Sequence, residues 1–162
     1  MIVLMMGVSG SGKTTLGRLL ADDLGWTFLD ADDFHPAANV RKLHAGTALT
    51  DEDRRPWLEA LRRRLEAARD EGEDVVLACS ALKHAYQHDL EAVSPEAVRI
   101  VFLDAPAAVI RGRLAARTGH FMSPDLLDSQ FQTLEPPDEA VRVDVSGSPS
   151  EAVAAARAGL GL

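Results

Sequence analysis

Gly7 and Gly12 bracket four residues and are followed by Lys13 and Thr14, so residues 7–14 match the pattern G-x-x-x-x-G-K-[ST] in full. The five residues before this segment form an unbroken apolar run that suits a buried parallel strand. The segment after it predicts a helix with a stripe of leucines on one face: Leu16, Leu19, Leu20 and Leu24. This order of strand, glycine loop and helix predicts a P-loop at the start of an α/β fold.

The physical chemistry of such a loop favours a bound polyanion. Glycines let the backbone turn with several N–H groups aimed inward, and the following helix adds the positive end of its dipole. Lys13 would reach the β- and γ-phosphates of a nucleoside triphosphate, and the Thr14 hydroxyl would bind Mg²⁺. A glycine-rich turn that matches by chance is the alternative, which the flanking strand and helix disfavour. The predicted nucleotide-binding residues of the loop are Gly7, Ser9, Gly10, Ser11, Gly12, Lys13, Thr14 and Thr15.

Length and composition limit the possible partners. The 162 residues fit one domain, taken here as residues 1–162, and their formal net charge of -8 argues against a general nucleic-acid binder. No apolar stretch approaches the ~20 residues that span a bilayer, so we expect no membrane segment. The first predicted strand begins at the N-terminus, so we expect no signal peptide. The single cysteine, Cys79, excludes an intrachain disulfide and suits a cytoplasmic protein.

Apolar runs alternate with helical patterns along the chain, which predicts a parallel sheet covered by helices. Further strands are expected at residues 26–30, 75–78, 98–103 and 141–145. Helices are expected at residues 36–45, 82–92 and 106–117, and three more helices are expected to begin at residues 50, 123 and 148. Thr50 with Asp53, and Ser148 with Glu151, have the spacing of helix-capping boxes. The predicted architecture is a P-loop three-layer fold: five parallel strands, helices on both faces and a small mobile lid at about 118–130.

Polar residues follow two of the predicted strands, at the sheet edge where open α/β folds bind ligands. The i, i+2 spacing of Asp30 and Asp32 would place both side chains on one side of an extended segment, near a metal and a substrate hydroxyl. The alternative is that these acidic residues only form a turn and cap the helix that follows it. Lys83 stands near a predicted helix start, where a lysine opposes the helix dipole unless an anion binds nearby. We expect Cys79 to be a small buried residue rather than a nucleophile.

A second group of cations precedes the predicted lid. Arg113 and Arg117 are four residues apart and share a helix face, which is unfavourable unless phosphates or acidic groups face them. The turn at Gly119 and the residues up to 123 would close over the phosphates and exclude water. The alternative is that these arginines are ordinary solvent-exposed charges on a helix, and this applies most of all to Arg111.

Three segments beyond the P-loop resemble the gluconokinase family of small P-loop kinases, which is related to shikimate and adenylate kinases. They are Asp-Asp-Phe-His-Pro at 32–36, Cys-Ser-Ala-Leu-Lys at 79–83 and Leu-Leu-Asp-Ser-Gln-Phe at 126–131. The resemblance runs from residue 5 to about residue 138. It departs from the family at Ala31, where glycine is usual, and at Ala85 and Gln87, where the family is often basic.

This resemblance implies ATP-dependent phosphorylation of D-gluconate at the 6-hydroxyl, with Mg²⁺ as cofactor, in a cytoplasmic homodimer. Asp30 would hold the metal through water beside Thr14, and Asp32 would orient the reacting hydroxyl. Arg54 is the best candidate to bind the gluconate carboxylate. Two other readings stay open: a kinase of another hydroxylated acid or a nucleotide, and a nucleotide-dependent switch without small-molecule chemistry.

The residues implied for each role follow from the matching positions. The catalytic set is Lys13, Asp32 and Arg117. Arg113 and Arg117 would join the loop in binding ATP. The substrate-binding set is Asp32, His35, Arg54, Lys83, His120 and Gln130.

Overall fold

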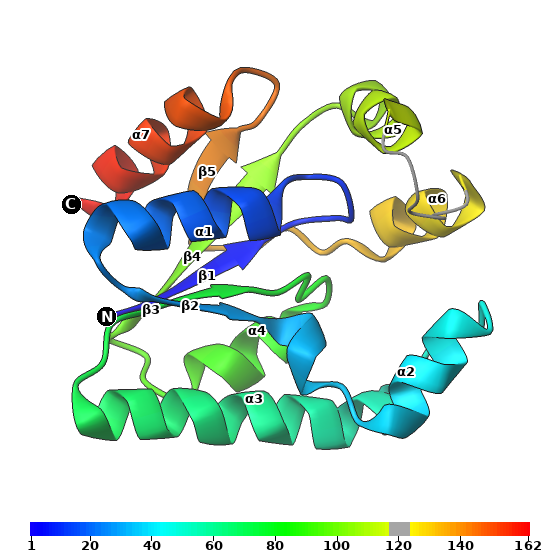
Figure 1. Cartoon of the computed structure of the whole chain (residues 1–162), viewed down its shortest axis with the longest axis horizontal. Coiled ribbons are helices and arrows are strands. Elements are labelled where there is room, and N and C mark those ends of the chain that lie inside the picture. The colour runs from blue at the N-terminus through cyan, green and yellow to red at the C-terminus, as the bar shows by residue number, and fades with distance from the viewer. Residues whose placement is uncertain (117–123) are drawn as a thin grey trace.

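Five apolar segments form one parallel sheet, as the sequence predicted (Figure 1). The computed structural model describes residues 1–116 and 124–162. The strands are β1 (Ile2–Met6), β2 (Thr27–Asp30), β3 (Val75–Ala78), β4 (Val98–Asp104) and β5 (Val141–Asp144). Their order in the sheet is β2-β3-β1-β4-β5, and every neighbouring pair is parallel. The strand that leads into the glycine loop is therefore the central one.

Helices cover both faces of this sheet, which confirms the predicted three layers (Figure 1). The helices are α1 (Lys13–Leu24), the 3₁₀ helix η1 (Ala31–Phe34), α2 (Ala37–His44), α3 (Asp51–Glu71), α4 (His84–Glu91), α5 (Ala107–Ala116), α6 (Pro124–Thr133) and α7 (Pro149–Leu160). α1 and α7 pack on one face, and α3 and α4 pack on the other. In the described ranges, none of these helices is both long enough and apolar enough to cross a membrane.

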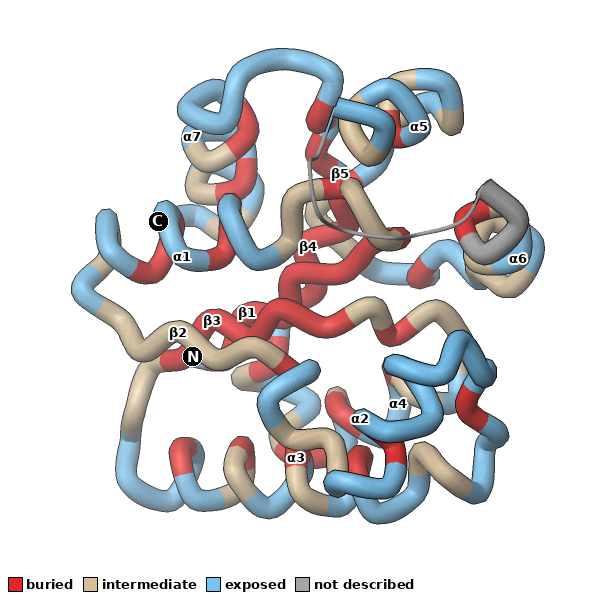
Figure 2. The backbone as a smooth tube through the Cα atoms, turned by 45° about the vertical axis from the view of Figure 1, so that its right-hand side comes forward, coloured by how far each residue is buried: buried red, intermediate tan, exposed pale blue. Residues whose placement is uncertain are grey.

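The core lies on both sides of the central strand. Because successive strand residues point to opposite faces, Val3 and Met5 pack with α1 and α7, whereas Leu4 and Met6 pack with α3. Figure 2 shows the central strands buried and much of the outer helical surface exposed. The inward face of α3 carries the predicted apolar residues Trp57, Leu58, Leu61 and Leu65, all buried.

One leucine of the predicted α1 stripe does not belong to the core. Leu16 and Leu20 are buried, but Leu19 is 42% exposed, so the buried face of α1 does not coincide with the whole stripe. The buried face of α1 includes Gly17, where an added Cβ would lie 2.8 Å from the Phe28 ring. The buried face of α1 is made of Leu16, Gly17, Leu20 and Ala21, and Leu19 lies beside it at the surface.

The helix boundaries follow the predicted capping chemistry, with one difference. Both capping boxes, Thr50 with Asp53 and Ser148 with Glu151, are present. The helix expected at 82–92 instead begins at His84. Lys83 is its extended N-cap, with φ -108° and ψ 142°.

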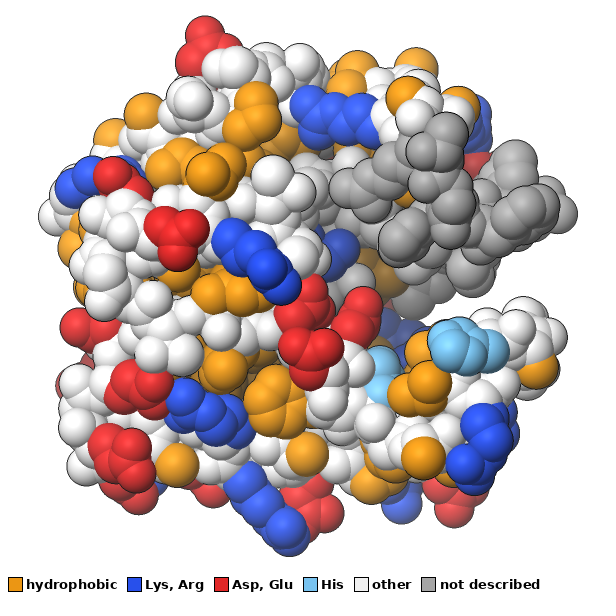
Figure 3. Space-filling model, viewed as in Figure 1, with side chains coloured by type: hydrophobic (Ala, Val, Ile, Leu, Met, Phe, Trp, Pro, Cys, Tyr) orange, Lys and Arg blue, Asp and Glu red, His pale blue; other side chains and the backbone are white. Residues whose placement is uncertain are grey.

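The arrangement brings the strand ends and several loops to one edge of the sheet. The carboxyl ends of the strands point to the right in Figure 1, where the glycine loop, η1, α2, α5 and α6 gather. On the face in Figure 3, acidic side chains cluster near the centre, over the segment that follows β2. Segments far apart in the sequence therefore contribute to one edge, and the candidate site is built there.

Candidate functional site

The glycine loop closes on itself through one carbonyl group. The Val8 carbonyl accepts hydrogen bonds from the Ser11 N–H at 3.2 Å and from Lys13 Nζ at 3.0 Å. Gly10 and Gly12 have φ of 81° and 96°, which side-chain-bearing residues adopt only with strain. Gly12 is also the N-cap of α1. The loop thus wraps around the positive end of a helix dipole, in the geometry that suits phosphate oxygens.

A cleft of about 360 Å³ opens on one side of this loop, and we call it the loop cleft. Its lining residues come from the glycine loop, β2, η1 and the end of β3: Ser9, Gly10, Gly12, Lys13, Thr14, Thr15, Asp30, Asp32, Ala78, Cys79 and Ser80. The small residues that follow β3 leave space at the strand end, as the sequence suggested. The loop cleft therefore joins the predicted phosphate-binding residues to both predicted aspartates.

Asp30 is held in place by two donors. Its Oδ2 accepts from the Thr14 hydroxyl at 2.9 Å, and its Oδ1 accepts from the backbone N–H of Asp32 at 3.1 Å. Asp30 is thus the N-cap of η1, so the cap reading of this cluster is correct for Asp30. Asp32 lies within the 3₁₀ helix rather than in the extended segment that we expected. The hydroxyl and carboxylate oxygens of Thr14 and Asp30 are nevertheless adjacent, and hard oxygen ligands suit Mg²⁺.

The Asp32 carboxylate is electrostatically disfavoured in its ionised form. Asp32 is an exposed residue, but partial burial of its carboxylate in the wall of the loop cleft raises its pKa above the ordinary 3.8, and neighbouring Asp30 raises it further. Nearby His35 and Lys13 act in the opposite direction and lower this pKa. Asp32 therefore lies within electrostatic reach of both the glycine loop and His35.

We expect Asp32→Asn to stabilise the protein at about pH 7, because the amide removes a desolvated and repelled charge. The sign follows from the raised pKa: the folded state is penalised above that pKa, and the penalty disappears as the pH falls toward 3.8. Urea unfolding over a pH series would show a gain at neutral pH that shrinks in acid. Asp33→Asn, which removes the same charge from the same turn, is the control, and an unchanged or lower stability of Asp32→Asn at neutral pH would contradict this expectation.

The turn that carries Asp32 is fixed by residues of α2 and α3. The indole Nε1 of Trp57 donates to the Ala31 carbonyl at 2.7 Å, and the Trp57 ring stacks on His35 at a centroid distance of 4.9 Å. The buried Asn39 amide lies 3.3 Å from His35 Nδ1 and donates to the Asp53 carbonyl at 2.8 Å. Burial lowers the pKa of His35, which favours its neutral form. His35 is therefore held at a defined place beside Asp32.

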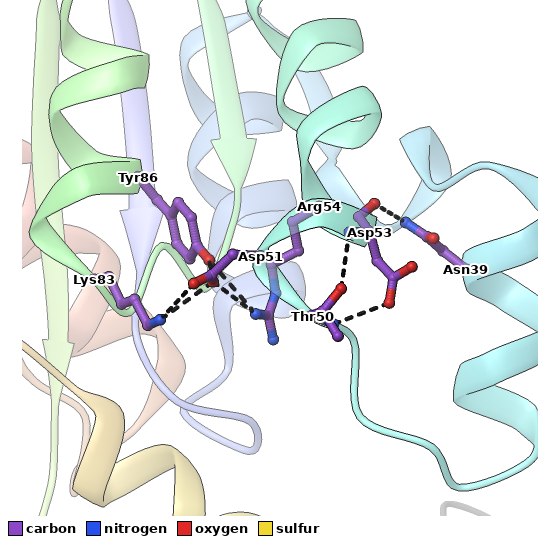
Figure 4. Close-up of polar contacts among 7 residues, drawn as sticks. All are labelled: Asn39, Thr50, Asp51, Asp53, Arg54, Lys83 and Tyr86. Carbon is purple, nitrogen blue, oxygen red and sulfur yellow. Dashed lines mark hydrogen bonds and ion pairs between the residues drawn. The ribbon is translucent and has the colours of Figure 1, made fainter.

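Next to His35, two predicted substrate cations meet at one carboxylate (Figure 4). Arg54 Nη1 lies 3.4 Å from Asp51 Oδ1, and Lys83 Nζ donates to the same oxygen at 3.2 Å. The Tyr86 hydroxyl also donates to this oxygen and lies 3.5 Å from Arg54 Nη1. We call Asp51, Arg54, Lys83 and Tyr86 the cation cluster. Neither Asp51 nor Tyr86 was predicted as a site residue, since no local motif marks a contact between positions 35 residues apart.

The backbone around Lys83 is tied to the segment that follows α6. The Glu135 N–H donates to the Leu82 carbonyl at 2.7 Å, and the Glu135 carboxylate accepts from the His84 N–H at 2.5 Å. The buried Gln87 amide donates to the carbonyls of Ala81 and Glu135, at 3.1 and 2.8 Å. These bonds hold Ala81 at φ 41°, an unusual value for a residue with a side chain. Gln87, where the family is often basic, thus has a structural role.

Gln130 of α6 contacts the glycine loop in this structure. Its Oε1 accepts from the Ser9 N–H at 2.7 Å, and its Nε2 lies 3.4 Å from the Ser9 hydroxyl. Its expected contact with the acceptor substrate therefore stays a prediction. Arg117, His120 and the first part of the expected lid, at 117–123, lie outside the described residues.

A second cleft, of about 270 Å³, adjoins the other side of the glycine loop, and we call it the C-terminal cleft. It is lined by Gly10, Ser11, Gly12, Thr15, Leu16, Arg113, Val145, Gly147, Ser148, Pro149 and Ala152. Arg113 donates to the Val145 carbonyl there, whereas Arg111 pairs with Asp128 at the surface. The sequence had indicated Arg113, but not the turn between β5 and α7, because that turn carries no phosphate-binding pattern. Both clefts share Gly10, Gly12 and Thr15, so one elongated ligand can reach both.

Cys79 is a buried residue, as predicted. Burial raises the pKa of its thiol to about 12, so the thiolate nucleophile is scarce at neutral pH. Cys79 therefore has the character of a structural residue at this site.

Known proteins are similar to this chain in both sequence and fold. The family model described as AAA domain matches residues 2–137. The chain is 46% identical over 156 residues to a probable gluconokinase from Xenopus tropicalis, covering 88% of this chain and 82% of the relative. It is 42% identical over 147 residues to the thermosensitive gluconokinase of Escherichia coli (strain K12), covering 88% and 78%. The crystal structure of a gluconokinase from Sinorhizobium meliloti 1021 has a TM-score of 0.89 at 42% identity, covering 98% of this chain and 90% of that one.

Proposed function

This chain belongs to the gluconokinase family, and we propose that it transfers the terminal phosphoryl group of ATP to the 6-hydroxyl of D-gluconate. The products are 6-phospho-D-gluconate and ADP. One observation carries the proposal: a single cleft brings Asp32 beside Lys13 of the glycine loop, and His35, in the next turn, stacks on Trp57 of α3, the helix whose first turn carries Arg54. A phosphoryl donor on the glycine loop and a carboxylate at the cation cluster would therefore lie on either side of Asp32.

In this proposal ATP spans the two clefts. Its phosphates bind the glycine loop and Lys13, and its nucleoside end extends into the C-terminal cleft beside Arg113. The shared lining residues of the two clefts support this placement. Arg117 would neutralise charge on the transferred phosphoryl group, with Arg113 behind it.

Thr14 and Asp30 have the chemistry to hold Mg²⁺. Mg²⁺ keeps several waters and takes few protein ligands, usually together with substrate phosphates. Thr14 would bind the ion directly and Asp30 through water, and the ion would neutralise phosphate charge.

The acceptor lies between Asp32 and the cation cluster. Arg54 and Lys83 bind the gluconate carboxylate at one end of the molecule, and His35 and Gln130 contact its hydroxyl groups. This fixes the 6-hydroxyl near Asp32, which orients the hydroxyl and accepts its proton as the oxygen bonds to the γ-phosphorus. The bond between that phosphorus and the bridging oxygen breaks, and ADP leaves. Positioning and charge neutralisation matter more here than the strength of the base.

A coupled ADP-release assay tests the proposal with gluconate, shikimate, glycerate and nucleoside monophosphates as acceptors. Turnover that depends on gluconate supports it. Turnover with another acceptor alone would identify a kinase of different specificity, and no acceptor-stimulated turnover would favour a nucleotide-dependent switch. We also propose a cytoplasmic homodimer, and light scattering of the purified protein would test the dimer.

A further inference from the structure

Given the proposed function, we propose that Asp51 is a positioning residue for the substrate carboxylate: it holds Arg54 and Lys83 together so that both can bind gluconate. Asp51 itself belongs to neither the predicted catalytic set nor the predicted binding set. It acts through the two cations rather than through contact with the reacting atoms.

The contacts in the cation cluster converge on one carboxylate (Figure 4). Asp51 Oδ1 receives Arg54 Nη1 at 3.4 Å, Lys83 Nζ at 3.2 Å and the Tyr86 hydroxyl, and Lys83 Nζ also donates to Oδ2 at 3.4 Å. These groups come from the start of α3, the N-cap of α4 and the first turn of α4. A single carboxylate therefore links two helices that are separate in the sequence.

Charge explains why such a residue is needed. Arg54 and Lys83 repel each other, and their long side chains would separate without an anion between them. Asp51 supplies that anion, and its hydrogen bonds with Tyr86 and Lys83 lower the pKa of its carboxyl group. The negative form of Asp51 is therefore maintained at neutral pH.

The cluster also retains capacity for a second carboxylate. Of the Arg54 nitrogens, only Nη1 contacts Asp51, at the long distance of 3.4 Å. A guanidinium has five N–H donors, so most of the Arg54 donors are left for another acceptor. The side chains of Arg54 and Lys83 are 31% and 36% exposed, so solvent reaches both cations. A substrate carboxylate can thus bind the cations without removing Asp51.

Helix capping does not account for Asp51. Thr50 and Asp53 already form the capping box of α3, and Lys42 pairs with Asp53 at 2.7 Å. Glu52 adds another acidic group to the first turn of α3. Its side chain makes no hydrogen bond or ion pair with the described part of the chain. Glu52 therefore supplies a matched control, since its removal takes the same charge from the same turn.

The experiment compares Asp51→Ala with Glu52→Ala in steady-state kinetics. We expect Asp51→Ala to raise the KM for gluconate about fivefold or more, with kcat and the KM for ATP within about twofold of the parent. Glu52→Ala should leave all three constants unchanged. A purely structural role for Asp51 would lower thermal stability or kcat without this selective rise in KM.

Tyr86→Phe gives a second and independent measurement. It should raise the KM for gluconate modestly, and the double variant with Asp51→Ala should be no worse than Asp51→Ala alone, because both act through one carboxylate. An unchanged or lower gluconate KM in Asp51→Ala, or full additivity with Tyr86→Phe, would overturn the inference while leaving the proposed function intact. If the parent protein neither binds nor phosphorylates gluconate, the proposed function fails and the inference fails with it.

Discussion

Lys13→Ala is expected to reduce kcat/KM for gluconate phosphorylation about 10²- to 10³-fold, the loss typical when one charge-stabilising donor is removed. Lys13 Nζ donates to the Val8 carbonyl within the loop and lines the loop cleft beside both aspartates. Its positive charge would meet the β- and γ-phosphates, where negative charge shifts during transfer. In Lys13→Ala, the negative charge of the phosphates has no lysine partner in a confined cleft.

The assay for Lys13 measures ADP release at saturating gluconate and a range of ATP concentrations. Lys13→Arg is the companion variant, since it keeps the charge but replaces a compact ammonium with a planar group that cannot reproduce its contacts. We expect it to recover only part of the rate. A kcat/KM close to that of the parent in Lys13→Ala, with an intact fold by circular dichroism, would refute the assignment of the loop as the phosphoryl-donor site.

Arg54→Ala is expected to raise the KM for gluconate about 10- to 100-fold, as the loss of a charged hydrogen-bonding partner implies. Arg54 lies in the cation cluster, and its electrostatic effect on His35 links it to the Asp32 side of the site. The glycine loop is not altered by this change, so the KM for ATP should stay near that of the parent. Such a split identifies a residue that binds the acceptor alone.

Arg62→Ala is the matched control for Arg54. It removes an arginine from the same helix at an exposed position that pairs with Glu66 at 3.6 Å, away from the cation cluster. We expect no change in either KM. Isothermal titration of ATP and of gluconate against both variants separates binding from turnover, and an equal loss of ATP and gluconate binding in Arg54→Ala would count against its assigned role.

Most of the fold could be predicted because local patterns and packing agree along the chain. The strands β1 and β3 are short apolar runs that are buried on both faces, and helix starts such as Thr50 carry explicit capping chemistry. Leu19 shows the limit of periodicity. The spacing of the leucines does not reveal that the Phe28 ring packs against Gly17, or that the buried face of α1 therefore includes Gly17 and not Leu19.

The site was predictable only where a local motif marks the chemistry. The glycine loop and the aspartates after β2 were found because their function depends on neighbours in sequence. Tyr86 and Asp51 were missed, since a phenol and an exposed helix-start acid have no meaning until α3 and α4 are packed together. The turn after β5 was missed for the same reason, because its cleft exists only when α7 lies beside α1.

The inert thiol of Cys79 gives this protein a practical use in spectroscopy. Because the sulfur is shielded and protonated in the native state, maleimide reagents should leave it untouched until the chain opens. A fluorophore can therefore be attached selectively to a cysteine engineered on α2 or α6 without first removing the native one. Conversely, the rate at which Cys79 itself becomes alkylated reports how often the end of β3, beside the loop cleft, is transiently exposed.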